Sequence, residues 1–224
     1  KTAGTLLTDF ERRAMALLAL GLNPYSINGE NYIEKIVANF DGKQFGDANE
    51  DNDDIFALIV LQNAGFTQNE KMISDDIDFI LSRQKENGSW DESVDMTGAS
   101  IEALSFFNQN EKVENALFKA VDFLKQNQKD DGGWHNPSST AWALEGLLAL
   151  GEKPENWIKN GNTPLDYLAS MQDADGGVKD ANGPNKIWQT AYVVSALSGK
   201  TWNGIMQKFK KSELPKPVEI QSTK

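Results

Sequence analysis

A repeat with a period of 44 residues constrains the fold of this chain more than any other feature. Three segments can be laid over one another: FILSRQKENGSW ends at position 90, FLKQNQKDDGGW at 134 and YLASMQDADGGV at 178. The same spacing relates the aromatic residue and the glutamine of each segment, which are Phe79, Phe123 and Tyr167, and Gln84, Gln128 and Gln172. A fixed period of this length is typical of stacked helical hairpins, in which each unit buries its apolar face against its neighbours.

Two kinds of helix alternate within this repeat. Residues 112–127 place apolar side chains at helical spacing on one side and charges on the other, which predicts an amphipathic helix. Residues 14–20, 140–150 and 187–197 carry at most one charge each, which predicts helices that are buried on nearly all sides. The amphipathic pattern recurs in residues 33–40, 73–81 and 202–209.

The alternation predicts an all-α fold of about five helical hairpins in two layers, with apolar helices inside and amphipathic helices outside. Such a fold is an α/α-toroid, and either a closed ring or an incomplete one satisfies the pattern. We expect residues 1–211 to form this repeat domain. Residues 212–224 contain two prolines and little apolar periodicity, so we expect a tail or a linker to other domains of a longer chain.

The composition excludes several classes of function. The chain has 33 acidic residues against 22 Lys and Arg, a formal charge of −11, which opposes binding to nucleic acids and anionic membrane surfaces. No run approaches the roughly 20 apolar residues that a membrane span needs. The chain has no cysteine and a single histidine, His135, so a zinc site of Cys and His ligands is excluded. We therefore predict no cofactor.

The segments Phe79–Trp90 and Phe123–Trp134, each with an aromatic residue, a glutamine and a closing Gly-x-Trp, resemble the QW repeats of squalene and other triterpene cyclases. Val178 departs from this pattern in the third copy, and Phe40–Phe45 is a degenerate fourth copy. The resemblance covers about residues 8–210 and implies the α/α-toroid that these cyclases share with protein prenyltransferase β-subunits. In that family the Trp and Gln hold neighbouring hairpins together. We expect a non-catalytic bacterial member of the superfamily.

A second resemblance concerns residues 51–54, which read Asp-Asn-Asp-Asp immediately before the apolar residues 55–61. They match the DxDD motif of class II terpene cyclases. Carried over by position, the resemblance implies that Asp53 is a general acid and that Asp51 and Asp54 are its neighbours. Clustered carboxylates raise the pKa of such an acid, which keeps it protonated.

Two other interpretations of this acidic stretch remain open. It stands where an inner helix is expected to begin, and Asp is favoured at helix N-caps. Alternatively, oxygen ligands for calcium alternate along Asp47, Asn49, Asp51 and Asp53, although the complete twelve-residue calcium loop is absent.

Candidate ligand-binding residues gather where the inner helices begin, because those helix ends and the glycine-rich turns share one face of a two-layer ring. We expect Asp95 and His135 at this face, and Trp142, Trp188 and Tyr192 further along the inner helices, where aromatic rings can hold apolar ligands, sugars or cations.

Two glutamates, Glu102 and Glu145, share one repeat position within apolar helices, five residues after Thr97 and Thr140. A buried carboxylate is costly unless it is solvated or paired. We therefore expect both side chains to point either into a water-filled central cavity or outward to solvent, and we include them among the candidate ligand-binding residues.

Three functions are consistent with these features. The first is a non-catalytic toroid module of a secreted or surface protein, or otherwise of a soluble cytoplasmic one, that binds a small molecule, a glycan or a protein. The second is a metal-independent enzyme of the class II terpene cyclase kind, which would protonate an alkene or epoxide from Asp53. The third is a structural spacer, for which side chains would fill the centre of the ring.

Overall fold

A computed structural model describes residues 6–179 and 183–211 and shows an all-helical fold. The described residues form no strand, and their only β-type pairings are isolated bridges in turns. The α-helices are α1 (Leu7–Ala19), α2 (Tyr32–Val37), α3 (Asp51–Asn63), α4 (Lys71–Arg83), α5 (Val94–Leu104), α6 (Glu111–Asn127), α7 (Pro137–Ala149), α8 (Pro164–Ser170), α9 (Gly183–Leu197) and α10 (Trp202–Ile205). Two 3-10 turns, Ser105–Phe107 and Pro154–Asn156, follow α5 and α7. The predicted tail, residues 212–224, lies outside the described residues.

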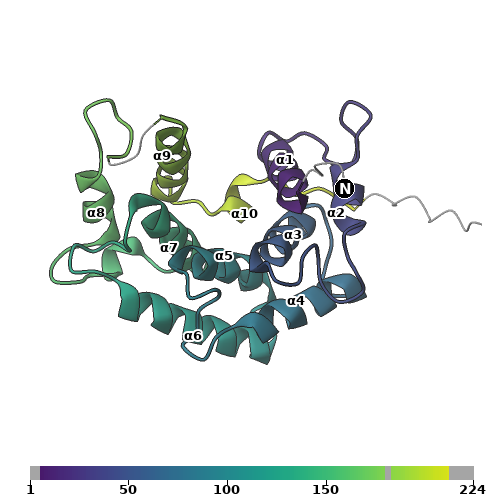
Figure 1. Cartoon of the computed structure of the whole chain (residues 1–224), viewed down its shortest axis with the longest axis horizontal. Helices are drawn as coiled ribbons and strands as arrows, with labels where there is room; N and C mark the ends of the chain where they lie inside the picture. The colour runs from purple at the N-terminus through teal and green to yellow at the C-terminus, as the bar shows by residue number, and fades with distance from the viewer. Residues whose placement is uncertain (1–5, 180–182, 212–224) are drawn as a thin grey trace, which may run out of the picture.

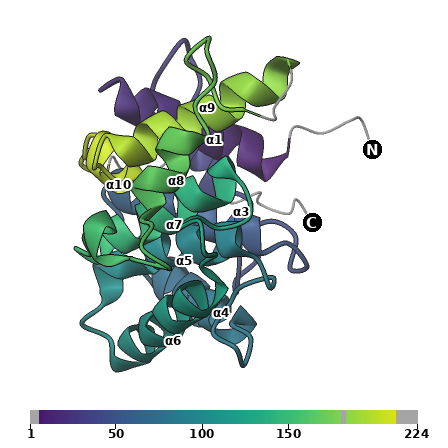
Figure 2. The same cartoon turned by 90° about the vertical axis from the view of Figure 1, so that its left-hand side faces the viewer.

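The odd-numbered helices α1, α3, α5, α7 and α9 pack against one another in chain order. Figure 1 shows them as an arc, with α2, α4, α6 and α8 around its outer side and with α1 and α9 at its two ends. Seen from the side, α8 and α9 lie at the front and α6 lies at the bottom of the view (Figure 2). This arrangement is compatible with a helical toroid. Within the described residues, no helix has the length and apolar character that crossing a membrane requires.

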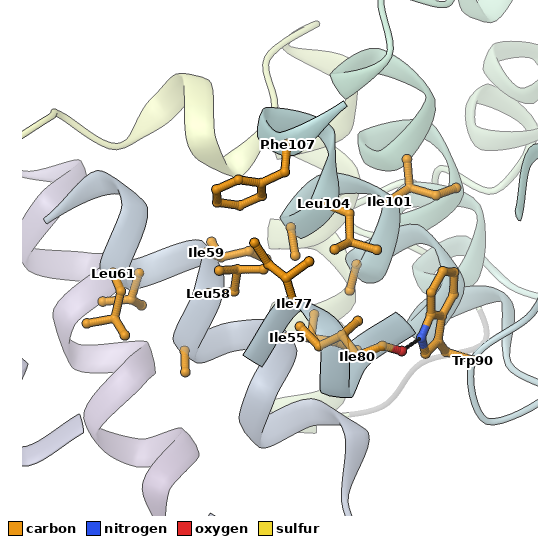
Figure 3. Packing of buried hydrophobic residues seen from close by; sticks show 14 of the residues in the cluster. Ile55, Leu58, Ile59, Leu61, Ile77, Ile80, Trp90, Ile101, Leu104 and Phe107 are labelled. Atoms are coloured by element: carbon orange, nitrogen blue, oxygen red, sulfur yellow. Dashed lines mark hydrogen bonds between the residues drawn. The ribbon is translucent and has the colours of Figure 1, made fainter. Parts of the chain in front are cut away.

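The apolar core lies between the inner and outer helices. In Figure 3, Ile55, Leu58 and Ile59 of α3 face Ile77 and Ile80 of α4 and Ile101 and Leu104 of α5, and all are at most 4% exposed. Helices α5 and α7 approach closely because Gly98 and Gly146 meet there, and a Cβ atom on Gly98 would clash with the backbone of Trp142. Burial of these apolar surfaces is the main source of stability.

The repeated Trp and Gln residues connect neighbouring units. The indole Nε1 of Trp90 donates to the carbonyl of Ile80 (2.7 Å), and that of Trp134 donates to Leu124 (2.8 Å). The amide of Gln84 donates to its own turn and to the carbonyl of Ala116 in the next hairpin (2.8 Å). Gln128 repeats this arrangement with the carbonyl of Trp157 (2.9 Å).

The predicted helix over residues 202–209 is wrong. Helix α10 is a single turn, and the segment from Thr201 to Lys211 instead crosses the carboxyl ends of the inner helices. The backbone N–H of Gln207 donates to the carbonyl of Leu18 (3.0 Å), and that of Phe209 donates to Asn63 (2.8 Å). The apolar side chains of this segment therefore contact the ends of the inner helices. They do not form one face of an outer helix. We call Thr201–Lys211 the floor segment.

The prediction that residues 187–197 are buried on nearly all sides is also wrong. In α9, Val193 and Ala196 are buried, and they belong to one apolar cluster with residues of α7, whereas Ile187 is 74% and Val194 is 61% exposed. None of the described residues forms a further hairpin that would cover the opposite side of α9. Among the described helices, α9 therefore packs against one inner helix, α7.

Candidate functional site

A cavity of about 370 Å³ lies inside the arc of inner helices. Its walls come from four helices and the floor segment: Thr8, Arg12, Met15, Ala16 and Ala19 of α1, Asn52 and Phe56 of α3, Trp142 of α7, Trp188 and Tyr192 of α9, and Trp202. The ring of Trp142 lies at the centre of an aromatic cluster, 5.4 Å from Tyr192, 5.9 Å from Phe56 and 6.0 Å from Trp202, measured between ring centroids. Such a cavity suits an apolar or aromatic ligand.

The polar residues of the lining come from α1 and α3. Thr8, Arg12 and Asn52 come from the amino-terminal halves of their helices, whereas Trp202 belongs to the floor segment at the carboxyl ends. The guanidinium of Arg12 donates to the hydroxyl of Thr8 (3.3 Å), and its Cζ lies 5.7 Å from the ring centroid of Trp188. This cation–π contact connects α1 with α9, the two ends of the arc.

The floor segment is held by the two glutamates of the inner helices. The carboxylate of Glu102 accepts the backbone N–H of Asn203 (2.8 Å), and that of Glu145 accepts the backbone N–H of Trp202 (3.1 Å). The side chain of Asn203 donates to the carbonyl of Glu102 (3.2 Å) and accepts from Asn63. Through these bonds the glutamates fix the position of Trp202 in the cavity.

The expectation that Glu102 and Glu145 face solvent or a water-filled cavity is therefore wrong. They are 0% and 1% exposed, and neither lines the cavity. Burial, reinforced by the charge of Glu145, raises the pKa of Glu102 well above its usual value. Burial raises the pKa of Glu145 to about 7, although the hydrogen bond from the backbone N–H of Trp202 opposes the shift.

The three aspartates of the DxDD motif point to three different places, and none of them lines the cavity. Asp51 is paired with Arg83 of α4 (2.5 Å). Asp53 is half-buried and accepts the backbone N–H of Asp47 (3.0 Å), and burial raises its pKa. Asp54 is fully buried and accepts the backbone N–H of Phe45 (2.6 Å). The residue of this stretch that reaches the cavity is Asn52.

The stretch begins an inner helix, as expected, but none of its aspartates is the N-cap. The N-cap of α3 is Glu50, whose side chain makes no cap hydrogen bond, and the three aspartates lie in the first turn of the helix. There they face the positive end of the helix dipole and bind the preceding loop or α4.

The oxygen atoms named for the calcium alternative are bound to protein groups or lie apart from one another. Among the described residues, no three acidic or histidine side chains are grouped so as to hold a metal ion. Asp47 accepts hydrogen bonds from Asn49, Asp53 accepts one from Asp47, and Asp51 pairs with Arg83.

A repeated hydrogen bond explains the position of Asp54. The backbone N–H of the residue at the Trp position is accepted by a threonine hydroxyl in three units: Thr97 (3.2 Å), Thr140 (2.9 Å) and Thr190 (3.1 Å). In the first unit Asp54 takes this place and accepts from Phe45. The sequence carried a signal for this role, because Asp54 precedes Thr97 by the same 43 residues that separate Thr97 from Thr140.

Asp54 belongs to a cluster of buried carboxyl groups that the sequence analysis missed. Its partners are Glu11 of α1 and Asp76 of α4, both 0% exposed. Burial raises the pKa of Asp54 to about 6, and burial together with the charges of Asp54 and Glu11 raises that of Asp76 well above its usual value. Both partners interrupt an apolar stripe at helical spacing, Glu11 between Leu7 and Ala14 and Asp76 between Ile73 and Ile80. This was the available signal.

The other candidate ligand-binding residues divide into two groups. Trp142, Trp188 and Tyr192 line the cavity as expected from their positions. Asp95 is half-buried at the start of α5, outside the lining, and His135 is exposed in the turn before α7 with a φ of 54°. The structure therefore brings the three aromatic candidates together and leaves Asp95 and His135 outside the cavity lining. Arg12 and Trp202 were not among the candidates.

The fold and the cavity together define the chain as a helical repeat protein with a central aromatic pocket. No family model matches it. The chain is 30% identical to squalene–hopene cyclase of Zymomonas mobilis, over a region that covers 52% of this chain and 21% of the cyclase. The chain thus spans about a fifth of the length of this curated relative. The similarity supports a distant relationship to squalene cyclase-like proteins.

Proposed function

We propose that this chain is a non-catalytic module that binds a small, largely apolar molecule in its central cavity. The observation that carries the proposal is the cluster of Phe56, Trp142, Tyr192 and Trp202 around about 370 Å³ of open space. Aromatic side chains contribute large apolar contact areas, and pockets of this kind are common ligand sites. The open cavity also argues against a structural spacer, whose centre would be filled by side chains. Our proposed setting is a secreted or surface-attached bacterial protein, in keeping with the acidic composition.

The experiment is to fill the cavity by mutation. Ala16 of α1 lines the cavity and is exposed, so an Ala16→Trp variant places a ring in the pocket without disturbing the core. We expect binding of an apolar probe such as decanol, followed by calorimetry, to weaken at least about tenfold, which corresponds to about 1.4 kcal/mol. The matched control is Asn115→Trp on the exposed side of α6. Equal binding by both variants would contradict the proposal.

A second candidate is an enzyme of the class II terpene cyclase kind with Asp53 as general acid. Two observations favour it: burial raises the pKa of Asp53, and the chain is similar to a squalene–hopene cyclase. Asp53 does not line the cavity, which is why we place this candidate second. It predicts turnover of a polyprenyl substrate by the wild-type chain and none by Asp53→Asn at unchanged stability. An inert wild-type chain would contradict it, since fold alone does not establish activity.

A further inference from the structure

The cavity contains one charged side chain among the described residues that line it, Arg12. Its guanidinium makes one hydrogen bond, to Thr8, and rests against the ring of Trp188. None of the ion pairs formed by the described residues involves Arg12. A guanidinium has five N–H donors in a planar fork that suits carboxylate and phosphate groups. Most of these donors are therefore available to a ligand.

The surroundings of Arg12 do not cancel its charge, in spite of the net charge of −11. Its sequence neighbour Glu11 is buried on the other side of α1. Burial and the charges of Asp53 and Asp54 raise the pKa of Glu11 well above its usual value, although Arg12 acts in the opposite direction. The raised pKa favours the neutral form of Glu11, which reduces the negative charge beside Arg12. The phenol of Tyr192 also stays protonated, because burial and the charge of Asp95 raise its pKa in opposition to Arg12.

A second polar group lines the same cavity. The side-chain oxygen of Asn52 is buried and has no hydrogen-bond partner among the described residues. Unlike Asp51, Asp53 and Asp54, which bind protein groups, Asn52 offers its amide to the contents of the cavity. The group of Asn52 that can bind an anion is the amide NH2, which makes no hydrogen bond to a described residue, whereas the unpaired oxygen accepts only from an N–H or O–H of a ligand.

We infer that the ligand is an amphipathic anion, with a carboxylate or phosphate group held by Arg12 and Asn52 and with an apolar body directed toward Trp202. This inference rests on the proposed function, because it assigns a chemical class to the molecule in the same cavity. Charge-assisted hydrogen bonds to Arg12 supply the selectivity for an anion. The aromatic cluster takes up the apolar part. Helices α1 and α9, which provide Arg12 and Trp188, lie at the two ends of the arc in Figure 1.

The experiment compares four probes that share a ten-carbon chain: decanoate, decyl phosphate, decanol and decyltrimethylammonium. The binding of each probe to the full chain is measured by calorimetry at neutral pH and low salt. We expect one of the two anions to bind roughly tenfold or more tightly than decanol, and the cation to bind least. Whichever anion binds more tightly identifies the head group. In Arg12→Met the affinity for that anion falls to the level of decanol, and in Arg12→Lys it falls part of the way, because the charge remains and the planar fork is lost.

The matched control is Arg13→Met, since Arg13 is exposed and does not line the cavity. It leaves the preference for the anion unchanged. Equal binding of decanol and both anions, with no effect of Arg12→Met, would overturn the inference and leave the proposed apolar pocket standing. If none of the four probes binds, the proposed function fails and this inference fails with it.

Discussion

Two groups of buried carboxyl groups differ in what surrounds them. At the floor, Glu102 and Glu145 each accept a backbone N–H from the floor segment. In the cluster of Glu11, Asp54 and Asp76, only Asp54 accepts a backbone N–H, and no N–H or hydroxyl of the described residues donates to the other two. The floor glutamates therefore hold a segment of backbone, whereas Glu11 and Asp76 make no such bond. The pKa is raised in both groups, because burial outweighs the N–H donors at the floor.

The raised pKa values in both groups make stability depend on pH in a defined direction. A carboxyl group whose pKa is raised in the folded state binds more protons there than in the unfolded chain. Its contribution to stability is then complete below the unfolded pKa and is lost as the pH rises through the folded value. For Asp54 the pKa rises from 3.8 to about 6, and for Glu145 from 4.5 to about 7. We expect the folded chain to lose stability between about pH 4 and pH 8.

The largest expected effect concerns the change in stability with pH, and the variant that tests it is Asp76→Asn. The wild-type free energy of unfolding should fall by on the order of 3 kcal/mol between about pH 4.5 and pH 8, because one pKa unit corresponds to about 1.36 kcal/mol. The Asp76→Asn side chain donates an N–H to Asp54, which can then ionise without loss. Urea unfolding at the two pH values should therefore show a smaller decrease for this variant, while the part of the decrease that comes from Glu145 remains. The control is Asp78→Asn on the same helix, where the side chain is 65% exposed. A wild-type stability independent of pH would contradict the protonated cluster.

A somewhat smaller effect is expected at the floor, where Asn203→Ala removes the side-chain bonds to Asn63 and Glu102. Because Asn203 is only 5% exposed, its loss leaves buried polar groups unpaired. The free energy of unfolding at neutral pH should fall by about 2 kcal/mol. Asn39→Ala serves as the control, since Asn39 is exposed and bonds only to the carbonyl of Lys35 within its own helical turn. A change below about 0.5 kcal/mol would show that the floor segment is not held by these bonds.

The smallest effect is expected for Asp51→Asn. Its ion pair with Arg83 is partly exposed, since 34% of the Arg83 side chain is accessible, so the loss should be about 1 kcal/mol or less and should shrink at high salt. Urea unfolding at low and high ionic strength measures this. A loss as large as that expected for Asn203→Ala would mean that the ion pair behaves as a buried pair.

Much of the fold could be predicted because the signal is local and repeated. The apolar residues of α3 and the amphipathic pattern of α6 follow from spacing alone, and the 44-residue period locates Trp90 and Trp134. The spacing of apolar residues along a helix does not show which other element, if any, covers its apolar side. This is why residues 187–197 were expected to be buried and why residues 202–209 were expected to form an outer helix.

The site was predicted in part. Trp142 and Tyr192 could be identified because they are aromatic residues in apolar helices. Arg12 could not, because it reaches the cavity only when α1 and α9 come to face each other at the ends of the arc. Glu102 was identified as unusual, but its partner Asn203 is about a hundred residues away in the chain, and no periodic pattern connects them.

The floor segment also has a consequence for how the chain folds. Proteins built from stacked repeats often unfold one unit at a time, because each unit contacts only its neighbours. Here the last described segment bonds to Leu18, Asn63, Glu102 and Glu145 in four different units. These contacts join residues that are far apart in the sequence, and they can form only after the four helices have assembled. They therefore arise late in folding. They join the first repeat to the last, and the described residues should therefore unfold in a single cooperative transition.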